Sequence, residues 1–235
     1  MTSIDTIIAS YGGVSTTSIL IFLSEYQKVN DIYNKDNIKH IRIPPMCYIN
    51  AKKPLLFSNP KGGYYGGKIL RKLHIKPFTA TAKLKLPKRA VYIFGDPYNA
   101  VLSFFKRKKI RGCFPMGHCN CLEGDYQDID IEWDIRDFLM NGKDLFRLQE
   151  HFINWTTAER SYPILAVKYE TMWNHLSELQ EFLHLPDSAM KSFPKKRERS
   201  SDWRKQPQDI QDGLERIYGK FWKMVDESPS IIRIC

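Results

Sequence analysis

The sequence predicts a single α/β domain in which a parallel sheet lies between layers of helices. Short apolar segments of the kind found in buried strands alternate with helical patterns, and this alternation favours parallel strands joined by helices. The chain has 235 residues, of which 43% are hydrophobic, so it can bury one sizeable core. No internal repeat or low-complexity tract divides it, and we treat residues 1–235 as one domain.

Three strand–helix pairs make up the expected sheet layer. Each pair starts with an apolar run bounded by turn residues and continues with apolar residues at helical spacing. The pairs are Ile4–Ala9 with Thr16–Val29, Ala90–Phe94 with the helix in "NAVLSFFKRKK", and Ile164–Val167 with Trp173–Leu183. The basic end of the second helix suits the negative end of a helix dipole.

The remaining segments are less regular. Residues 31–89 are rich in Lys, Pro and Gly, and we expect loops there with a helix at Lys68–Leu73 and a strand near His74–Lys76. Residues 110–132 form an excursion to which we assign no element. Further helices are expected near Ile135–Leu139 and Leu145–Trp155, and at Asp209–Met224 after the polar, basic loop "SFPKKRERSSDWRKQPQ".

The turn after the first strand, "SYGGVSTT", has the order of a phosphate cradle. Its two glycines free the backbone to point N–H groups at an anion, and the following helix adds a partial positive charge at its N-terminus. The lysine-containing form G-x-x-x-x-G-K-[ST] is absent, because no Gly-Lys precedes the hydroxyl residues. Two interpretations stay open on this stretch alone: a phosphate-binding loop without its lysine, or a plain N-capped helix.

The net charge indicates which kind of partner the chain binds, and the cysteine content indicates its redox compartment. The formal net charge of +10 suits an anionic partner such as a nucleotide, a nucleic acid, an acidic glycan or a membrane surface. The five cysteines are odd in number and unevenly spread, which argues against a disulfide framework and for a reducing compartment. The apolar run Ile19–Leu23 is too short to span a bilayer and no basic segment precedes it. We therefore expect a soluble, cytoplasmic chain with no signal peptide and no membrane span.

Two motifs at strand ends carry a resemblance to a known family. The chain resembles the sulfotransferases that use 3′-phosphoadenosine 5′-phosphosulfate (PAPS), whose first motif is roughly S-Y-P-[KR]-S-G-T-T and whose second is roughly R-[DN]-P-x-[DN]-x-x-x-S. Here "SYGGVSTT" and "GDPYNAVLS" stand at these places. The residues kept are Ser10, Tyr11, Thr16 and Thr17 in the first motif and Asp96, Pro97, Asn99 and Ser103 in the second.

Two later motifs extend the resemblance over most of the chain. The family has a Tyr-Glu pair after an apolar strand, and "VKYETM" supplies Tyr169 and Glu170. It also has a basic loop that ends in D-W-[KR], to which "KKRERSSDWRK" is similar, although the family's glycines are missing. Four such motifs in order favour this family over a generic α/β protein.

The resemblance implies a fold related to P-loop kinases and a role for each matched residue. The first motif would cradle the 5′-phosphosulfate, the second and fourth would hold the 3′-phosphate, and the tyrosine would lie against the adenine. The implied nucleotide-binding residues are Gly12, Gly13, Ser15, Thr16, Thr17, Ser103, Tyr169, Arg197 and Arg199.

Three departures from the family pattern affect the expected chemistry. Gly13 replaces the loop cation, Gly95 replaces the arginine of the second motif, and Phe78 stands where many members have a catalytic histidine. Lys76 matches the family's second lysine, and His74 lies two residues earlier on the same face of the expected strand. We therefore take Lys76 and His74 as the catalytic candidates, with no metal.

The sequence leaves several functions open. The favoured one is transfer of a sulfuryl group from PAPS to a hydroxyl or amine acceptor, with 3′-phosphoadenosine 5′-phosphate (PAP) as product and with other cations (Lys61, Lys68, Lys106, Arg107 or Arg197 besides Lys76) refilling the site. The alternatives are an inactive nucleotide-binding relative, a nucleotide kinase or a basic nucleic-acid-binding protein, although no nucleic-acid reading motif is present. A small phenol or alcohol, a glycan and a protein tyrosine are all open as the acceptor, and the positive charge favours an acidic glycan or another anionic acceptor.

Two further clusters are interpreted as structural. "CFPMGHCNC" brings Cys113, His118, Cys119 and Cys121 close together in the sequence, but the spacing is not that of a zinc site. We expect buried thiols and a surface histidine. "EGDYQDIDIEWD" is expected to be an exposed acidic loop.

Overall fold

The computed structural model describes most of the chain outside one long segment. It covers residues 5–29, 40–44, 87–110, 112–198 and 200–234. The expected helix at Lys68–Leu73 and the expected strand near His74–Lys76 lie outside these residues.

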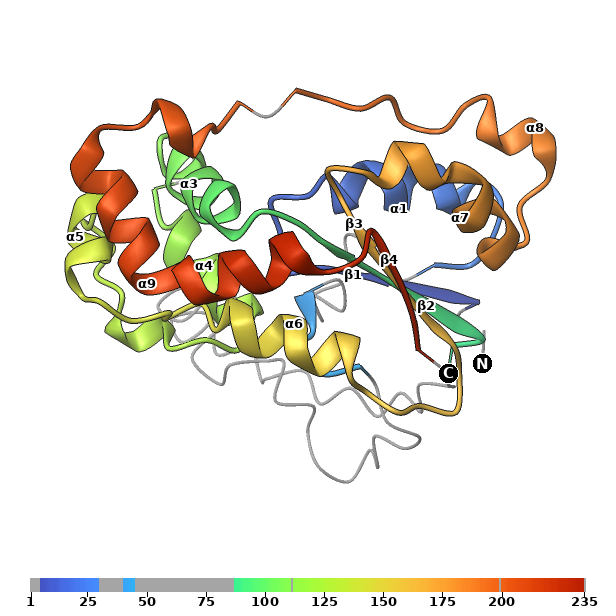
Figure 1. The fold of residues 1–235 in the computed structure, drawn as a ribbon, viewed down its shortest axis with the longest axis horizontal. Coiled ribbons are helices and arrows are strands. Elements are labelled where there is room, and N and C mark those ends of the chain that lie inside the picture. The colour runs from blue at the N-terminus through green and yellow to red at the C-terminus, as the bar shows by residue number, and fades with distance from the viewer. Residues whose placement is uncertain (1–4, 30–39, 45–86, 111, 199, 235) are drawn as a thin grey trace, which may run out of the picture.

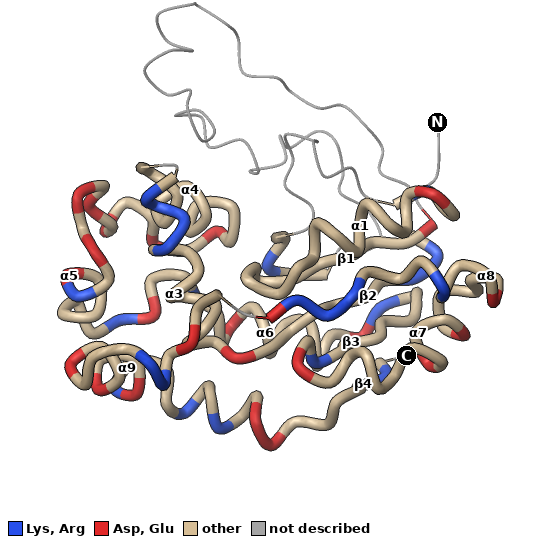
Figure 2. The backbone as a smooth tube through the Cα atoms, turned by 90° about the horizontal axis from the view of Figure 1, so that it is seen from above, with Lys and Arg blue, Asp and Glu red and all other residues tan. Residues whose placement is uncertain are grey.

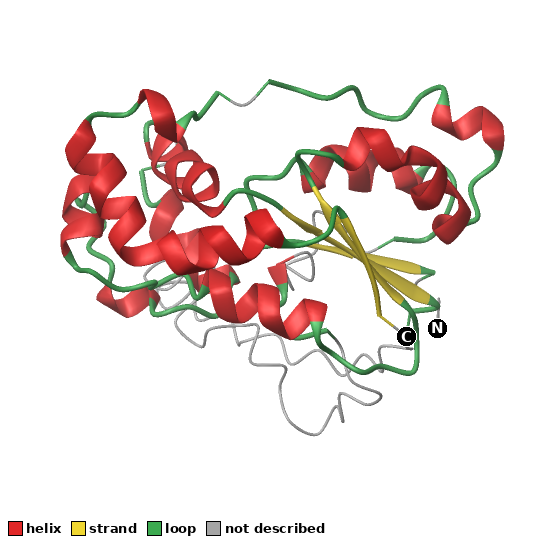
Figure 3. Ribbon diagram, viewed as in Figure 1, coloured by secondary structure: helices red, strands yellow, loops and turns green. Residues whose placement is uncertain are grey.

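A four-stranded sheet forms the centre of the described fold (Figure 3). The strands β1 (Thr6–Ala9), β2 (Arg89–Phe94) and β3 (Ile164–Lys168) are parallel and adjacent in that order. The last strand, β4 (Ile231–Ile234), pairs antiparallel with β3. Because the three parallel strands run the same way, the loops that leave β1, β2 and β3 all emerge at one edge of the sheet.

The described residues also form eight α-helices and three short 3₁₀ helices. The α-helices are α1 (Thr16–Ser24), α3 (Pro97–Lys108), α4 (Phe114–Cys121), α5 (Ile135–Met140), α6 (Leu148–Thr156), α7 (Leu176–Leu183), α8 (Asp187–Met190) and α9 (Gln208–Glu227). The 3₁₀ helices are η2 (Tyr126–Asp128), η3 (Met172–His175) and η4 (Trp203–Lys205). Of these elements, α3, α4 and α5 gather with part of α9 beyond one end of the sheet (Figure 1).

The helices cover both faces of the sheet (Figure 1). Alternate strand residues point to opposite faces, and the two sets of residues enter two separate hydrophobic clusters. One face packs against α1 and α7 and contributes Ile8, Val91, Ile93, Leu165 and Val167. The other packs against α6 and α9 and contributes Ile7, Ala9, Tyr92, Phe94 and Ala166. The predicted α/β class with helices on both faces is therefore confirmed.

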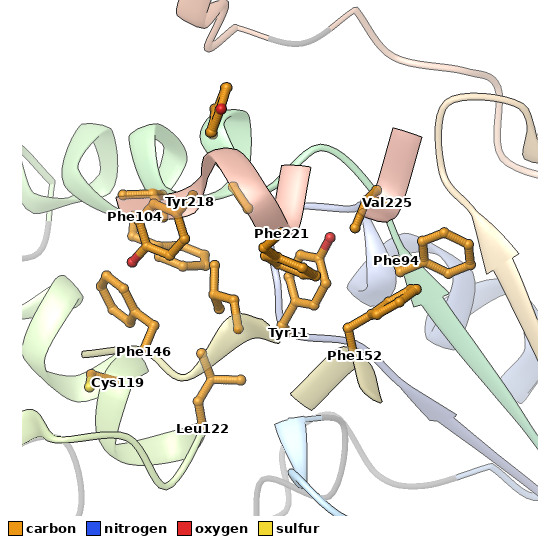
Figure 4. Close-up of a cluster of buried hydrophobic side chains, with 14 of the residues drawn as sticks. Tyr11, Phe94, Phe104, Cys119, Leu122, Phe146, Phe152, Tyr218, Phe221 and Val225 are labelled. Atoms are coloured by element: carbon orange, nitrogen blue, oxygen red, sulfur yellow. The ribbon is translucent and has the colours of Figure 1, made fainter. Parts of the chain in front are cut away.

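The core below the second face is strongly aromatic (Figure 4). The ring of Tyr11 stands edge-on to that of Phe221 at 6.1 Å between centroids. Tyr92 stacks on Trp155 with the rings 5.2 Å apart and 10° from parallel. Tyr11 follows the end of β1, and its buried side chain packs in this core. It therefore anchors the first residues of the loop between β1 and α1.

The first helix is shorter than the sequence indicates. We expected it to continue to Val29, but α1 ends at Ser24. The chain turns over residues 25–27, the Lys28 carbonyl accepts the N–H groups of Asp5 and Thr6, and Val29 forms a parallel bridge with Thr6. Val29, which the sequence pattern assigned to the helix, therefore pairs with β1 at the edge of the sheet.

Most of the other described elements agree with expectation, but η2 and α8 were not expected, and η4 (Trp203–Lys205) lies in a stretch that was expected to be a loop. The three predicted strands that fall on described residues are present, and the helices expected near residues 135, 145 and 209 correspond to α5, α6 and α9. The helix expected at Trp173–Leu183 is divided into η3 and α7. Helix α4 was not expected, because Pro115 and Gly117 weaken its helical pattern. Strand β4 was not expected, because it has only four residues.

None of the helices in the described ranges combines the length and the apolar character that crossing a bilayer requires. The longest of them, α9, has buried residues along one side and charged residues along the other. This distribution is typical of a helix that packs against a protein core.

Candidate functional site

The loop between β1 and α1 has the backbone of an anion cradle. Gly12, Gly13 and Ser15 have φ angles of 97°, 72° and 55°. Left-handed residues next to right-handed ones turn successive N–H groups toward one side, which forms a concave site for an anion. Ser15 pays a small conformational cost for this shape because it has a side chain.

The N–H groups of this loop are available to a ligand. No hydrogen bond joins the N–H groups of residues 13–17 to any acceptor in the described part of the chain. These groups lie at the N-terminus of α1, where the helix dipole also favours negative charge. No acidic residue occupies the first turn of α1. N–H groups of this kind at the N-terminus of a helix are the donors that anion sites in proteins commonly use.

The hydroxyl groups of Ser10 and Thr16 form hydrogen bonds within the loop, whereas that of Thr17 does not. Ser10 Oγ accepts the Gly12 N–H at 3.1 Å and lies 2.6 Å from Thr16 Oγ1. Thr16 is buried, so its hydroxyl serves the loop itself. Thr17 is exposed, and its hydroxyl forms no hydrogen bond within the described residues. Of the two threonines, Thr17 is the one that is free to contact a ligand.

Gly13 lies directly against helix α3. A Cβ atom at this position would come within 2.9 Å of Ala100 Cα and 3.0 Å of Ser103 Oγ. The Ser103 hydroxyl donates a hydrogen bond to the Ala100 carbonyl at 2.7 Å, and its oxygen keeps acceptor capacity. The structure thus brings Ser103 next to the loop, and it leaves no room at Gly13 for the cation of the family pattern.

Tyr11 joins the loop to the end of β2. Its hydroxyl accepts the Gly95 N–H at 2.8 Å and donates to the Gly95 carbonyl. Gly95 stands where the family pattern has an arginine. Both positions that lack a family cation are therefore points where the loop contacts the β2–α3 segment.

Tyr169, which follows β3, closes the other side of the site. Its hydroxyl lies 3.2 Å from Ser15 Oγ and 3.4 Å from the carbonyl oxygen of Arg197. The neighbouring Glu170 accepts the Asp96 N–H at 3.1 Å. The Tyr-Glu pair therefore touches both the first loop and the second motif.

Asp96 organises the N-terminus of α3. Its carboxylate accepts the Asn99 N–H at 3.0 Å and the Trp203 indole N–H at 3.1 Å. Asn99 in turn accepts the Trp203 backbone N–H at 3.0 Å through its side-chain oxygen. The fourth motif is thus bonded to the second.

A basic segment crosses between α8 and η4 beside this site (Figure 2). Lys196 Nζ donates to the Glu170 carbonyl at 2.8 Å, and Lys106 Nζ donates to the Ser200 carbonyl at 2.9 Å. Arg107 lies over the Phe114 ring at 5.2 Å. Of the described replacement candidates, Arg197 has its backbone carbonyl beside Tyr169 and an exposed side chain with no ion pair among the described residues.

Two histidines contact the underside of the loop, and sequence reasoning did not assign them to it. His118 Nε2 lies 2.9 Å from the Tyr11 carbonyl oxygen, and His40 Nδ1 lies 2.9 Å from the Ser10 carbonyl oxygen. His118 is 4% exposed, so the expectation of a surface histidine is wrong. His118 is buried because α4 packs against α3 and presents its ring to Gly12.

Of the three thiols near His118 that were expected to be buried, Cys119 is buried, whereas Cys113 and Cys121 are half-buried. Cys119 is buried and donates to the Leu145 carbonyl at 3.1 Å, and burial raises the pKa of its thiol well above the usual range. Among the residues that the structure describes, no group of three His, Cys, Asp or Glu side chains could hold a metal ion. In the acidic stretch nearby, Asp125 pairs with Arg147 and Asp134 forms the capping box of α5.

The described candidate residues come from three strand ends and meet in one region. The loop supplies Gly12, Gly13, Ser15, Thr16 and Thr17, with Ser103 beside Gly13, Tyr169 beside Ser15 and Arg197 beside Tyr169. The catalytic candidates Lys76 and His74, and Arg199 of the nucleotide set, lie outside the described residues, as do Lys61, Lys68 and Phe78.

Comparisons of this chain with protein-family models, with curated proteins and with solved structures found no match. The functional interpretation therefore depends on the residues and the geometry of the site. That geometry is a glycine-containing loop whose N–H groups at residues 13–17 find no acceptor among the described residues, with the Ser103 hydroxyl on one side and the Tyr169 hydroxyl on the other.

Proposed function

We propose that this chain binds PAPS at the loop between β1 and α1 and transfers its sulfuryl group to a hydroxyl or amine acceptor. The observation that carries the proposal is the set of N–H groups at residues 13–17, which bond to no acceptor that the structure describes and lie between Ser103 and Tyr169. A phosphosulfate accepts hydrogen bonds at several oxygens at once, so a row of fixed donors suits it.

The two sides of the loop support the placement of the adenosine and its 3′-phosphate. Tyr169 is 3% exposed, and its ring stands edge-on to Trp173 at 5.1 Å. Its hydroxyl edge, rather than a free face of the ring, is directed toward Ser15. The adenine would lie against this edge, and the 3′-phosphate would meet Ser103 and the guanidinium of Arg197. This arrangement uses the same residues that the resemblance implies.

In the proposed reaction the acceptor oxygen or nitrogen attacks sulfur, the bond from sulfur to the bridging oxygen breaks, and PAP leaves with the electron pair. The proton of the acceptor passes to a base, for which His74 is the candidate from the sequence. Negative charge grows on the departing phosphate, so fixed donors and cations near it lower the barrier. The loop amides would supply part of this stabilisation, and Lys76 would supply the charge.

A second candidate, nucleotide binding without transfer, is favoured by the surroundings of Gly13. The atoms of Ala100 and Ser103 fill the space that a loop cation would need. Without a cation at this point, the loop could hold a nucleotide but would stabilise a departing phosphate less well. The two candidates share the binding site and differ only in turnover.

Thermal unfolding with PAP, with ATP and without ligand tests the shared binding step, because a ligand of the native state raises the melting temperature. We expect PAP to raise it more than ATP does. The double variant Thr17→Ala/Ser103→Ala should weaken PAP binding by about one to two decades, since it removes two hydroxyl contacts to phosphate.

Two results would decide against these proposals. Equal stabilisation by PAP and ATP, or none by either, would contradict a PAP site. If PAP binds but radiolabelled PAPS passes no sulfur to a panel of phenols, glycans, amines and tyrosine peptides, the binding-only candidate is correct. Steep salt dependence of binding to DNA or RNA of any sequence, with no effect of PAP, would instead favour a nucleic-acid-binding protein.

A further inference from the structure

The two histidines beneath the loop form a support that neither the motifs nor the proposed chemistry includes. His118 from α4 and His40 from residues 40–44 have their rings 4.6 Å apart, nearly perpendicular to each other. They are 4% and 8% exposed. They contact the carbonyl oxygens of Tyr11 and Ser10, which are consecutive residues at the start of the loop.

The contacts define which ring nitrogen carries hydrogen. A carbonyl oxygen only accepts hydrogen bonds, so the ring nitrogen that faces it must donate. His118 therefore carries hydrogen on Nε2 and His40 carries hydrogen on Nδ1. Each bond holds one carbonyl on the underside of the loop. In a planar trans peptide the N–H points the opposite way, so each bond also directs the following N–H away from the histidine.

A chain of hydrogen bonds continues from His118 to the first turn of α1. His118 holds the Tyr11 carbonyl, the N–H of the same peptide unit (Gly12) donates to Ser10 Oγ, and that oxygen lies 2.6 Å from Thr16 Oγ1. Linked hydrogen bonds of this kind strengthen one another in a buried setting. The orientation of His118 is thus connected to the residue at which the helix begins.

Gly12 and the ring of His118 fit each other closely. A Cβ atom on Gly12 would lie 2.4 Å from His118 Nε2. The ring is held in place by Phe104 at 4.2 Å and by Phe114, which stacks on it at 5.5 Å and 12°. The imidazole is therefore fixed by aromatic packing, with its donor aimed at the loop.

We infer that His118 and His40 are positioning residues that hold the anion-binding conformation of the loop by donating hydrogen bonds to its backbone. This inference rests on the proposed function for its link to PAP, but the support of the loop is a property of the free protein. They do not contact the ligand, because the nitrogens that face the loop are already bonded to its carbonyls.

Paired substitutions separate the donor from the ring. His118→Phe keeps an aromatic ring between Phe104 and Phe114 and removes the donor, whereas His118→Gln places an amide nitrogen near the position of Nε2. His40→Phe and His40→Asn form the matching pair for Nδ1. His175→Phe is the control, because the His175 ring bonds to the Glu178 carboxylate at 3.0 Å rather than to the loop.

Two measurements are made on each variant: PAP affinity by calorimetry and the NMR order parameters of the Gly12 and Gly13 amides without ligand. We expect His118→Phe to weaken PAP binding about tenfold, as for a lost buried hydrogen bond, and to lower the two order parameters toward the flexible range. His118→Gln should restore both, and His175→Phe should change neither. The His40 pair should behave in the same way, which keeps the test valid if His118→Phe does not fold.

The outcomes of this test are distinct from those for the proposed function. Wild-type order parameters in His118→Phe or His40→Phe would overturn the inference, whatever the protein binds. Lowered order parameters that the amide variants do not restore would also overturn it, since the ring rather than the donor would then be responsible. If the wild type does not bind PAP, the proposed function fails, and the order parameters alone decide the role of the histidines.

Discussion

At the scale of single residues, different neighbours exclude a side chain at each of the two glycines of the loop. Gly12 faces the His118 ring, and Gly13 faces the backbone of Ala100 and the hydroxyl of Ser103. Both also have positive φ angles, which disfavour residues with a Cβ atom. The loop is therefore shaped from below by α4 and from the side by α3.

We predict that Gly12→Ala destabilises the protein more than Gly142→Ala does. Gly142 has a φ of 75° and open space at the Cβ position, so its substitution introduces only backbone strain, about 1–2 kcal/mol. Gly12→Ala has a similar strain and adds the contact with His118, which should cost roughly 1–3 kcal/mol more. Urea denaturation of the two variants measures the difference. Equal losses would mean that His118 moves aside at no cost.

Single residues also mark the limit of what the sequence could predict about the site. The motif residues Ser103 and Tyr169 lie beside the loop, as their places at strand ends suggested. The role of His118 could not be predicted, because its partner Tyr11 is 107 residues away and the two meet only through the packing of α4. The one available signal was a histidine among apolar residues in "CFPMGHCNC", which suits a buried ring as well as an exposed one.

At the scale of secondary-structure elements, the N-terminus of α3 is the junction at which the motifs meet. Asp96 caps the helix through Asn99 and also accepts the indole N–H of Trp203, which follows the basic segment. The cap therefore has a tertiary role in addition to its local one.

We predict that Asp96→Ala lowers the free energy of unfolding by about 2–4 kcal/mol, because it removes the cap and leaves the Trp203 N–H without this partner. Asp134→Ala is the matched control. Asp134 caps α5 through Arg136 and Asp137 and is exposed, so its loss should cost about 1 kcal/mol. Denaturation curves for both variants decide the matter, and a loss at Asp96 no larger than that at Asp134 would show that the contact with Trp203 contributes nothing.

The elements that sequence reasoning placed correctly have a strong local pattern. Strands β2 and β3 are continuous apolar runs, and α9 has a long amphipathic repeat. The end of α1 and the whole of β4 depend on pairing with distant residues, Thr6 in one case and Leu165 in the other. Local pattern carries no information about such partners.

At the scale of the whole molecule, two buried ionisable groups oppose each other in their effect on stability. Burial raises the pKa of Asp144 from 3.8 to about 6 and lowers the pKa of His151 from 6.5 to about 3. Between pH 4 and 6 the native state holds more protons at Asp144 than the unfolded state does, and fewer at His151. Stability therefore falls with rising pH on account of Asp144 and rises on account of His151.

We predict that Asp144→Asn makes the stability rise more steeply between pH 4 and 6 than in the wild type, by about 1–3 kcal/mol over that range. His151→Phe should have the opposite effect, because the fall due to Asp144 is then no longer offset. Urea denaturation at several pH values measures both slopes. Parallel curves for Asp144→Asn and the wild type would show that the Asp144 carboxyl has the same pKa in the native and unfolded states.

The arrangement of helices on both faces of a mostly parallel sheet is the feature that the sequence predicted best. It follows from the alternation of apolar runs and helical patterns, which is a property of the whole chain. The four motifs carry the resemblance to the sulfotransferases, but the chain departs from them at Gly13, Gly95 and Phe78, so the sequence pattern predicts the place of the site better than its chemistry.

The late position of α9 and β4 in the chain affects how the protein folds during translation. These elements supply Phe221 and Val225 over the aromatic face of the sheet and the last strand beside β3, yet they are translated after every other part of the described fold. At roughly 5–20 residues per second, the nascent chain spends a few seconds with this face and this strand edge open to its surroundings. That interval is when the newly made chain most needs a chaperone, and slow codons between residues 200 and 234 would prolong it.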